Sequence, residues 1–333
     1  MTATPRARVQ RRPVHGVLLL DKPLGLSSNQ ALQKAKWLLR AEKAGHTGTL
    51  DPLATGVLPL CFGAATKFSQ GQLEAGKSYA ATLCLGVSTT TGDAEGDVVA
   101  RRPVPPMDAG ALEAVRQRFL GRISQLPPMH SALKKDGKPL YAYARDGVEV
   151  ERTPRQVQID ELKMAPAQAG GTWEAIDLIL KCSKGTYVRT LGEDIGAALG
   201  CGGHLTHLRR IGTGPFGIEQ CVTLEALEAM SEGERLARLL PVESLVAEHA
   251  HIVLDEQDAG RFLSGLRRRG AWADAPAVAV FAPSPLPREE GGEQNRGKEP
   301  FIFLGTAHVQ SGELIPERLL NPVEIQQILQ QNF

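Results

Sequence analysis

The chain has 333 residues, with a hydrophobic fraction of 42% and a charged fraction of 23%, which is typical of a globular protein with one large domain or two smaller ones. No apolar run approaches the roughly 18 residues that a membrane-spanning helix needs, so we expect no membrane association. The five scattered cysteines, an odd number, argue against a disulfide framework and are typical of reduced thiols in a cytoplasmic protein.

The net charge of +1 conceals an asymmetry along the chain. Residues 1–150 contain 20 Lys and Arg against 12 Asp and Glu, whereas residues 151–333 contain 18 against 25. A basic half indicates a polyanionic partner, and ordinary charge scatter over a solvated surface is the alternative. Residues 1–13 hold four arginines and no apolar core, which predicts a flexible basic tail rather than a secretory signal.

The first half of the chain is predicted to begin with a buried strand over residues 14–20. A helix over 27–39 follows, because serines stand at its start and apolar residues recur at helical spacing behind them. Further strands are predicted over 56–62 and 79–85, and a further helix over 109–120.

The regular pattern is interrupted at residues 126–154. Four prolines divide this stretch, which is basic and contains two tyrosines, so it is predicted to be an insertion on the surface. Strands over 156–163, 174–182 and 204–211, with a helix over 190–199, are expected after it.

A composition shift over residues 240–251 predicts a domain boundary. The unit beyond it, residues 249–333, is predicted to be small and β-rich, with a short helix over 257–266. Residues 283–300 are rich in Pro, Glu and Gly, which predicts a mobile segment. Because strands and helices do not alternate strictly, we expect an α+β fold with a mixed, largely antiparallel central sheet.

Residues 45–56 form the segment richest in chemical information. Glycines allow backbone turns that other residues do not tolerate, and Pro52 restricts Asp51 to an extended conformation. An acid on a rigid loop close to His46 is preorganised as catalysis requires. A plain turn is the alternative for Asp51, because Asp-Pro pairs are common turn starters.

Five motifs in order over residues 16–210 resemble the TruB family, the bacterial tRNA pseudouridine-55 synthases. They are GVLLLDKPLGLSSN (16–29), GHTGTLDPLATGVLPL (45–60), KSY (77–79), GTYVRTL (185–191) and LRR (208–210). The agreement of several ordered motifs is far more specific than that of any one of them.

The resemblance implies a pseudouridine-synthase catalytic domain over residues 14–245, with 126–154 as an RNA-gripping thumb and a PUA-like domain over 249–333. It also implies that the enzyme flips a uridine at position 55 out of the tRNA T-loop and isomerises it to pseudouridine. No metal and no cofactor are implied. We expect a cytoplasmic monomer that binds the tRNA T-arm and has no obligate protein partner.

Three residues would carry the chemistry by this resemblance. Asp51 would be the attacking carboxylate, with C1′, C6 or a glycal route as open alternatives. Arg189 would pair with Asp51, keeping it ionised and oriented. Tyr79 would lie against the flipped uracil and act as a base, with core packing in a strand as its alternative.

Four further residues would form the pocket. His46 would contact the RNA, and Lys22 and Tyr187 would support the site. Tyr187 is expected on the same strand face as Arg189, because the two are two residues apart. Leu208 would close an apolar floor, with ordinary core packing as the alternative.

The thumb would grip the RNA backbone through its basic side chains. We expect phosphate contacts from Lys134, Lys135, Lys138 and Arg152. For each of them, a solvated surface charge is the alternative.

Two other functions compete with the isomerase. An RNA-folding factor would bind tRNA with catalysis secondary, and such a tRNA-chaperone role is compatible with the isomerase itself. A glycoside hydrolase would need a second acid facing Asp51, whereas the motifs provide Arg189.

Two motif-like patterns are not expected to be functional. The glycines of residues 212–217 match a dinucleotide fingerprint without opening a helix. Cys201, His204 and His207 form an incomplete metal-ligand set.

Overall fold

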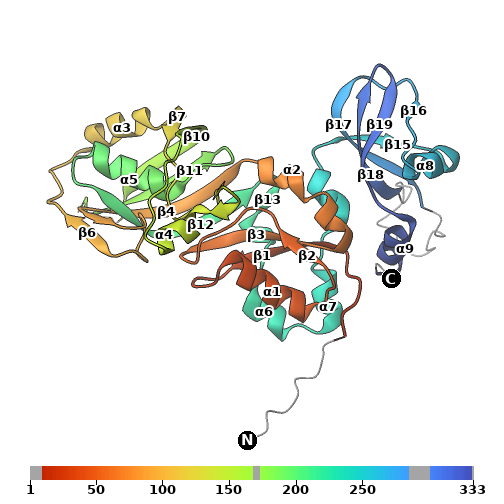
Figure 1. The fold of residues 1–333 in the computed structure, drawn as a ribbon, viewed down its shortest axis with the longest axis horizontal. Coiled ribbons are helices and arrows are strands. Elements are labelled where there is room, and N and C mark those ends of the chain that lie inside the picture. The colour runs from red at the N-terminus through yellow and green to blue at the C-terminus, as the bar shows by residue number, and fades with distance from the viewer. Residues whose placement is uncertain (1–9, 168–172, 285–300, 332–333) are drawn as a thin grey trace, which may run out of the picture.

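The computed structural model describes residues 10–167, 173–284 and 301–331 (Figure 1). They form a ten-stranded sheet and a separate five-stranded sheet, with two short two-stranded ribbons. Within these residues, no helix is long and apolar enough to cross a membrane.

The ten-stranded sheet is largely antiparallel, with parallel pairs only where β1 meets β14 and β3 meets β12. Its main path runs through β14 (Val222–Thr223), β1 (Gly16–Lys22), β3 (Ala54–Phe62), β12 (Gly203–Thr213), β4 (Lys77–Leu85), β11 (Ala175–Cys182), β10 (Arg155–Pro166) and β7 (Gly121–Gln125). Off this path, β2 (Ala44–His46) pairs with β3 and β13 (Phe216–Gly217) pairs with β12. The predicted α+β fold with a mixed, largely antiparallel sheet is confirmed.

Both faces of the sheet are covered around β1, which explains its unbroken apolar sequence. Leu18 and Leu20 belong to the main core, whereas Val17 and Leu19 belong to a second core on the opposite face. In β4, by contrast, burial alternates with the period of two that a strand with one buried face requires.

Helices cover the main-core face. They are α1 (Ser28–Leu38), α3 (Ala109–Arg118), α5 (Val188–Ala198), α6 (Leu224–Ala229) and α7 (Glu232–Ala237). Helix α2 (Ser69–Glu74) packs instead with the 3-10 turns η1 (Gly63–Lys67) and η3 (Val242–Val246) at the second core, and η2 (Ile218–Gln220) follows β13. Helix α1 begins where expected because Ser27 and Gln30 form a capping box. Figure 1 shows α3 and α5 towards one end of the sheet and α1, α6 and α7 towards the other.

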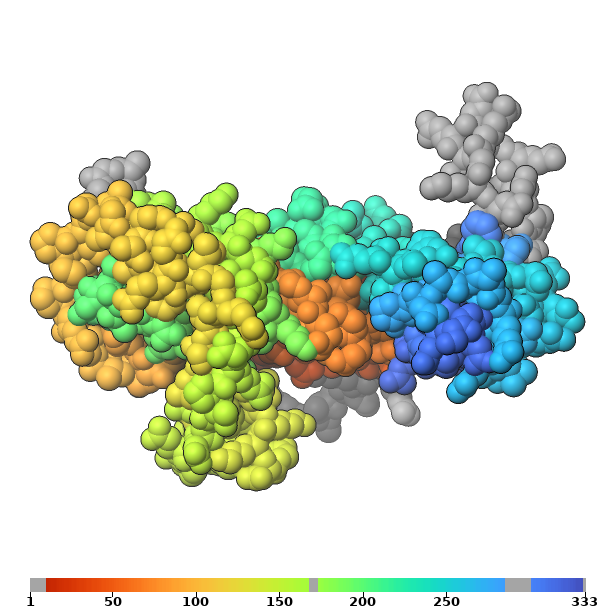
Figure 2. Space-filling view, turned by 90° about the horizontal axis from the view of Figure 1, so that it is seen from above, coloured from red at the N-terminus to blue at the C-terminus, as the bar shows by residue number. Residues whose placement is uncertain are grey.

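Residues 126–154 contain β8 (Lys134–Lys135), β9 (Lys138–Pro139) and α4 (Leu140–Arg145). Figure 2 shows this yellow to yellow-green segment standing out from the rest of the molecule. The other ribbon pairs β5 (Val87–Thr89) with β6 (Val98–Arg101).

The five-stranded sheet has the order β15 (Ala250–Val253), β17 (Ala275–Pro283), β18 (Phe301–Gln310), β19 (Glu313–Leu319) and β16 (Arg268–Arg269). The expected short helix is α8 (Glu256–Leu263), and a helix that the sequence reading missed, α9 (Pro322–Gln331), ends the described chain.

The five-stranded sheet docks on the second core of the large sheet. Phe281 and Phe303 pack in one cluster with Val17 and Leu19, and the Lys67–Glu324 ion pair reinforces the contact. The five-stranded sheet therefore does not cover the face of the large sheet that carries the main core.

Two sequence expectations are corrected. Residues 10–13 are not part of a flexible tail, because Arg12 bridges to Ala41 and forms an ion pair with Glu232. Residues 45 and 46 of the expected loop instead belong to strand β2, since backbone pairing with β3 outweighs the weak strand propensity of glycine. Residues 1–9 of the expected tail and 285–300 of the expected mobile segment lie outside the described residues.

Gly56 permits the parallel pairing of β3 with β12. Its φ is +100°, and an added Cβ would lie 2.1 Å from the carbonyl oxygen of Arg210. We expect Gly56→Ala to lower the free energy of unfolding by about 2–4 kcal/mol, from backbone strain and overlap together. Urea denaturation followed by circular dichroism measures this loss.

Gly121→Ala is the matched control, because its φ of +87° is similar and open space surrounds the position of the new Cβ. It should cost only the backbone strain, about 1–2 kcal/mol. Equal losses for the two variants would contradict the packing argument.

Candidate active site

A cavity of about 800 Å³ lies over β4 and β12, between the first residues of α1 and of α5. Six residues predicted for the site line it: His46, Asp51, Tyr79, Tyr187, Arg189 and Leu208. These residues come from four separate segments of the chain, and the fold brings them together.

The loop that carries Asp51 is fixed by the start of α1. Ser28, almost fully buried, donates from Oγ to the carbonyl of Leu50 at 2.9 Å and accepts from its N–H at 2.7 Å. The carbonyl of Pro52 accepts from the N–H of Gly25 at 2.9 Å. The backbone on both sides of Asp51 is thus held, which leaves the carboxylate a narrow range of positions.

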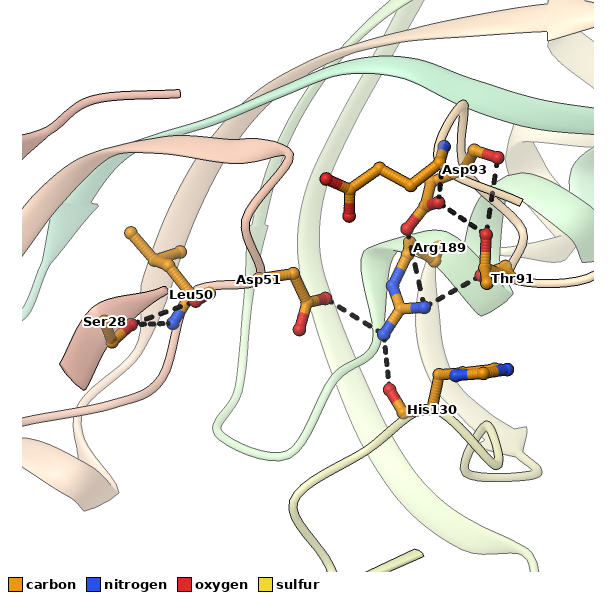
Figure 3. A network of polar contacts seen from close by, with 8 residues as sticks. Ser28, Leu50, Asp51, Thr91, Asp93, His130 and Arg189 are labelled. Atoms are coloured by element: carbon orange, nitrogen blue, oxygen red, sulfur yellow. Dashed lines mark hydrogen bonds and ion pairs between the residues drawn. The ribbon is translucent and has the colours of Figure 1, made fainter. Parts of the chain in front are cut away.

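Asp51 forms an ion pair with Arg189, with 2.9 Å between Oδ2 and Nη2 (Figure 3). The Arg189 side chain is 6% exposed, whereas that of Asp51 is 40% exposed to the cavity. A buried cation therefore orients a carboxylate that a substrate can still reach.

Both terminal nitrogens of the Arg189 guanidinium have partners besides Asp51. It donates to the carbonyls of Thr91 at 2.8 Å and His130 at 2.7 Å, and Asp93 lies 3.5 Å away on the side opposite Asp51 (Figure 3). Because the cation is shared between two carboxylates and two carbonyls, its burial is compensated and its position is fixed.

Tyr187 and Arg189 do not share a strand face. The helix begins at Val188, two residues earlier than expected, so Arg189 lies in its first turn and Tyr187 precedes it. Both side chains still line the cavity. The buried Gln125 fixes Tyr187 by accepting from its N–H and donating to its carbonyl.

Tyr79 and Leu208 form the floor of the cavity on adjacent strands. They are 9% and 6% exposed, and β4 and β12 pair directly at this point. Burial raises the pKa of the Tyr79 phenol, while the neighbouring Arg210 opposes that shift.

His46 and Lys22 differ in their relation to the cavity. His46 lines it, and burial followed by the charge of Arg210 lowers its pKa, which favours the neutral imidazole at neutral pH. Lys22 lies beneath the loop, fully buried, and its ammonium donates to the carbonyls of Pro23, Leu26 and Pro52. Burial lowers the Lys22 pKa to about 8.

Three residues of the site were missed from the sequence: Asp93, Glu95 and Arg210. Asp93 is held because the turn at residues 92–94 pairs with β12 at Leu205. Glu95 lines the cavity, and its pKa is raised by burial and by the charges of Asp93 and Asp51. The acids beside glycines in 92–96 were the available signal, similar to that around Asp51.

The four basic residues expected on the thumb lie outside the cavity lining as the described residues define it. Lys138 pairs with Asp146, Lys135 donates to the carbonyl of Glu151, and Arg152 donates to that of Pro127. Lys134 is exposed on β8. Other thumb residues, including His130 and Tyr141, line the cavity instead.

The two motif-like patterns expected to be non-functional have local structural roles in and around β12. Residues 212–217 form the end of β12, a turn at 214–215 and β13, and only the three-residue 3-10 turn η2 follows them, so the glycines open no α-helix. His204 is buried with Nδ1 2.8 Å from the carbonyl oxygen of Val87, whereas His207 is exposed.

The sequence matches two descriptions of one protein family. TruB family pseudouridylate synthase (N terminal domain) matches residues 36–188, and tRNA pseudouridylate synthase B C-terminal domain matches residues 189–247. The tRNA pseudouridine synthase B of Verminephrobacter eiseniae is 60% identical over 331 residues, 99% of this chain and 96% of that protein. That of Cupriavidus taiwanensis is 53% identical, over 94% of this chain and 96% of its own.

Solved structures share the fold at low identity. A Cbf5–Nop10–Gar1 complex matches with a TM-score of 0.65 at 23% identity, over 93% of this chain and 87% of the other. An H/ACA RNP bound to a substrate RNA containing 2′-deoxyuridine matches with a TM-score of 0.64 at 22% identity, over 93% and 86%. On its nearly full-length identity to curated relatives, the chain belongs to the TruB family of pseudouridylate synthases.

Proposed function

We propose that this protein isomerises uridine to pseudouridine in tRNA, at position 55 of the T-loop. The ion pair between Asp51 and Arg189 carries the proposal, because it presents one oriented carboxylate to a cavity in a member of the TruB family. Curated relatives named tRNA pseudouridine synthase B support tRNA as the substrate.

The reaction breaks the bond between uracil N1 and ribose C1′, turns the base and joins its C5 to C1′. The hydrogen at C5 leaves as a proton and N1 gains one, so the product is an isomer of the substrate. Attack of Asp51 on C1′, attack on C6 and a glycal route all need a carboxylate at this place. Retention of the detached uracil requires a closed pocket around it.

Arg189 sets the direction of the Asp51 carboxylate. Its contacts to Thr91, His130 and Asp93 keep the guanidinium in place while charge on Asp51 changes during the reaction. A fixed cation of this kind needs no reorganisation when the bond breaks.

The uracil would bind over Leu208 with its face against Tyr79. Tyr79 would then accept the proton that leaves C5. Burial raises the pKa of its phenol, and the neighbouring Arg210 opposes that rise. His46 would contact the RNA as a neutral imidazole, and Tyr187 would close the pocket beside Arg189. Lys22 would support the loop from below.

The target base must leave its stack to reach the cavity. We infer that residues 126–154 act as a thumb on the T-arm, because they project from the body and also line the cavity.

The unit from about residue 249 onward would be a PUA-like RNA-binding domain. The five free thiols support a cytoplasmic enzyme, which we expect to act as a monomer.

Asp51→Asn should abolish pseudouridine formation and preserve tRNA binding, because it removes the reacting carboxylate without altering phosphate contacts. Release of tritium from uracil C5 of labelled tRNA should fall by at least about a thousandfold. Filter binding should show a Kd within about threefold of wild type.

Asp177→Asn is the control, since this exposed carboxylate accepts from Thr82 on β4, away from the cavity lining. It should retain full tritium release. Full release by Asp51→Asn would remove Asp51 from the mechanism, and loss of tRNA binding would show that its role is structural.

Joint replacement of Lys134, Lys135 and Lys138 by glutamine should weaken tRNA binding and flatten its salt dependence. The slope of log Kd against log salt concentration should fall by about 1–2. This is less than three full phosphate contacts would give, since the RNA must displace the existing contacts of Lys135 and Lys138. Filter binding over a salt series measures it.

Lys163→Gln with Lys181→Gln is the control, removing two positive charges where the thumb variant removes three, because both lysines are exposed on the β10–β11 face opposite Tyr79. An unchanged slope in the thumb variant, or an equal change in the control, would show that the thumb lysines make no specific phosphate contact.

A further inference from the structure

Arg210 is the largest of the fully buried side chains of the described chain, at 1% exposure. It lies on β12, where this strand pairs with Gly56 of β3 on one side and with Tyr79 of β4 on the other. The residue therefore stands at the junction of the strand after the Asp51 loop and the strand that carries Tyr79.

The guanidinium of Arg210 ties the Asp51 loop to the sheet. It donates from Nε to the carbonyl of Val57 at 2.7 Å and from Nη2 to the carbonyl of Gly48 at 3.2 Å. A Cβ added to Gly48 would lie 3.3 Å from Nη1, so the loop backbone rests directly on the guanidinium. Gly48 is three residues before Asp51.

Arg210 also lies directly opposite Tyr79 in the β4–β12 pairing, and both residues line the cavity. Its charge acts on the Tyr79 phenol and opposes the rise in pKa that burial causes. Its charge also acts on other groups of the cavity wall. Burial is the main cause of the lowered pKa values of His46 and Lys77, and the charge of Arg210 lowers them further.

Arg210 has no ion pair with a carboxylate among the described residues. A buried cation held by carbonyls alone costs more than an apolar residue that would fill the same space. The charge is therefore better explained by what it faces, the Tyr79 hydroxyl and the cavity, than by a need to fill the core.

We propose that Arg210 is a positioning residue for the isomerisation, which holds the Tyr79 hydroxyl and the Gly48 end of the catalytic loop in one fixed arrangement. This inference rests on the proposed function and adds to it a second arginine. Arg189 orients the carboxylate that attacks, and Arg210 orients the phenol on the floor of the same cavity.

The adjacent Arg209 provides a matched comparison. It is half-buried, makes two hydrogen bonds to the carboxylate of Asp21 and a third to Thr55, and does not line the cavity. The two arginines share a strand and a side-chain chemistry, but only Arg210 lies opposite Tyr79 and lines the cavity with it.

The test is a double-mutant cycle between Arg210 and Tyr79, measured as single-turnover tritium release with enzyme in excess. Arg210→Lys should lower the rate by about 10- to 100-fold, the loss expected for a charged hydrogen bond, while the tRNA Kd stays within about threefold. In a Tyr79→Phe background, the same change should cost less than about threefold. Arg209→Lys should leave the rate unchanged.

Equal losses from Arg210→Lys in both backgrounds would overturn the proposal, as would an equal loss from Arg209→Lys. A second variant keeps the test open if Arg210→Lys does not fold. Gly48→Ala places a Cβ 3.3 Å from Nη1 of Arg210 and also strains the backbone, whose φ is +81°. The part of its effect that acts through the guanidinium should likewise shrink in the Tyr79→Phe background. A wild-type protein that forms no pseudouridine would instead refute the proposed function.

Discussion

The burial of the Arg189 guanidinium is the constraint around which the site is organised. A cation that is only 6% exposed must find partners for its donors, and it finds them on three segments. Asp51 comes from the loop before β3, Thr91 and Asp93 from the turn after β5, and the His130 carbonyl from the base of the projecting insertion. The same bonds that stabilise the charge therefore assemble the cavity.

A second arginine performs a related task on the floor of the cavity. Arg210 lies across the parallel pairing of β3 with β12, which is possible because Gly56 lets the two backbones approach. Its bonds to Val57 and Gly48 transmit the geometry of the sheet to the loop. The loop before Asp51 is thus fixed from below and the carboxylate from the side, which leaves one direction open for a substrate.

The large sheet carries the five-stranded sheet on one face and the cavity on the other. Its second core, around Val17 and Leu19, is covered by Phe281 and Phe303 of the five-stranded sheet. The cavity lies on the other face, where the insertion projects (Figure 2). The carbonyl of His130 accepts from Arg189, which in turn pairs with Asp51. A movement of the insertion would therefore shift the guanidinium and, through it, the Asp51 carboxylate.

Local sequence determined a large part of this protein. Hydrophobic periodicity located most strands and helices of the large sheet, because burial on one face imposes it, and the Gly- and Pro-rich loop singled out Asp51. Ordered motifs related Asp51 to Tyr79 and Arg189. Strand β2 and helix α9 were not predicted. The glycine in β2 has a weak strand propensity, and α9 packs on residues that lie far away in the chain.

Only the tertiary structure decided which charges meet. Nothing in local spacing relates Asp93 to Arg189, or Arg210 to Gly48, because these residues are separated by long stretches of chain and meet through strand pairing. The spacing of Tyr187 and Arg189 even misled, since a helix begins between them. Residue types and the order of elements follow from sequence, whereas the compensation of a buried charge depends on contacts that exist only after the sheet has formed.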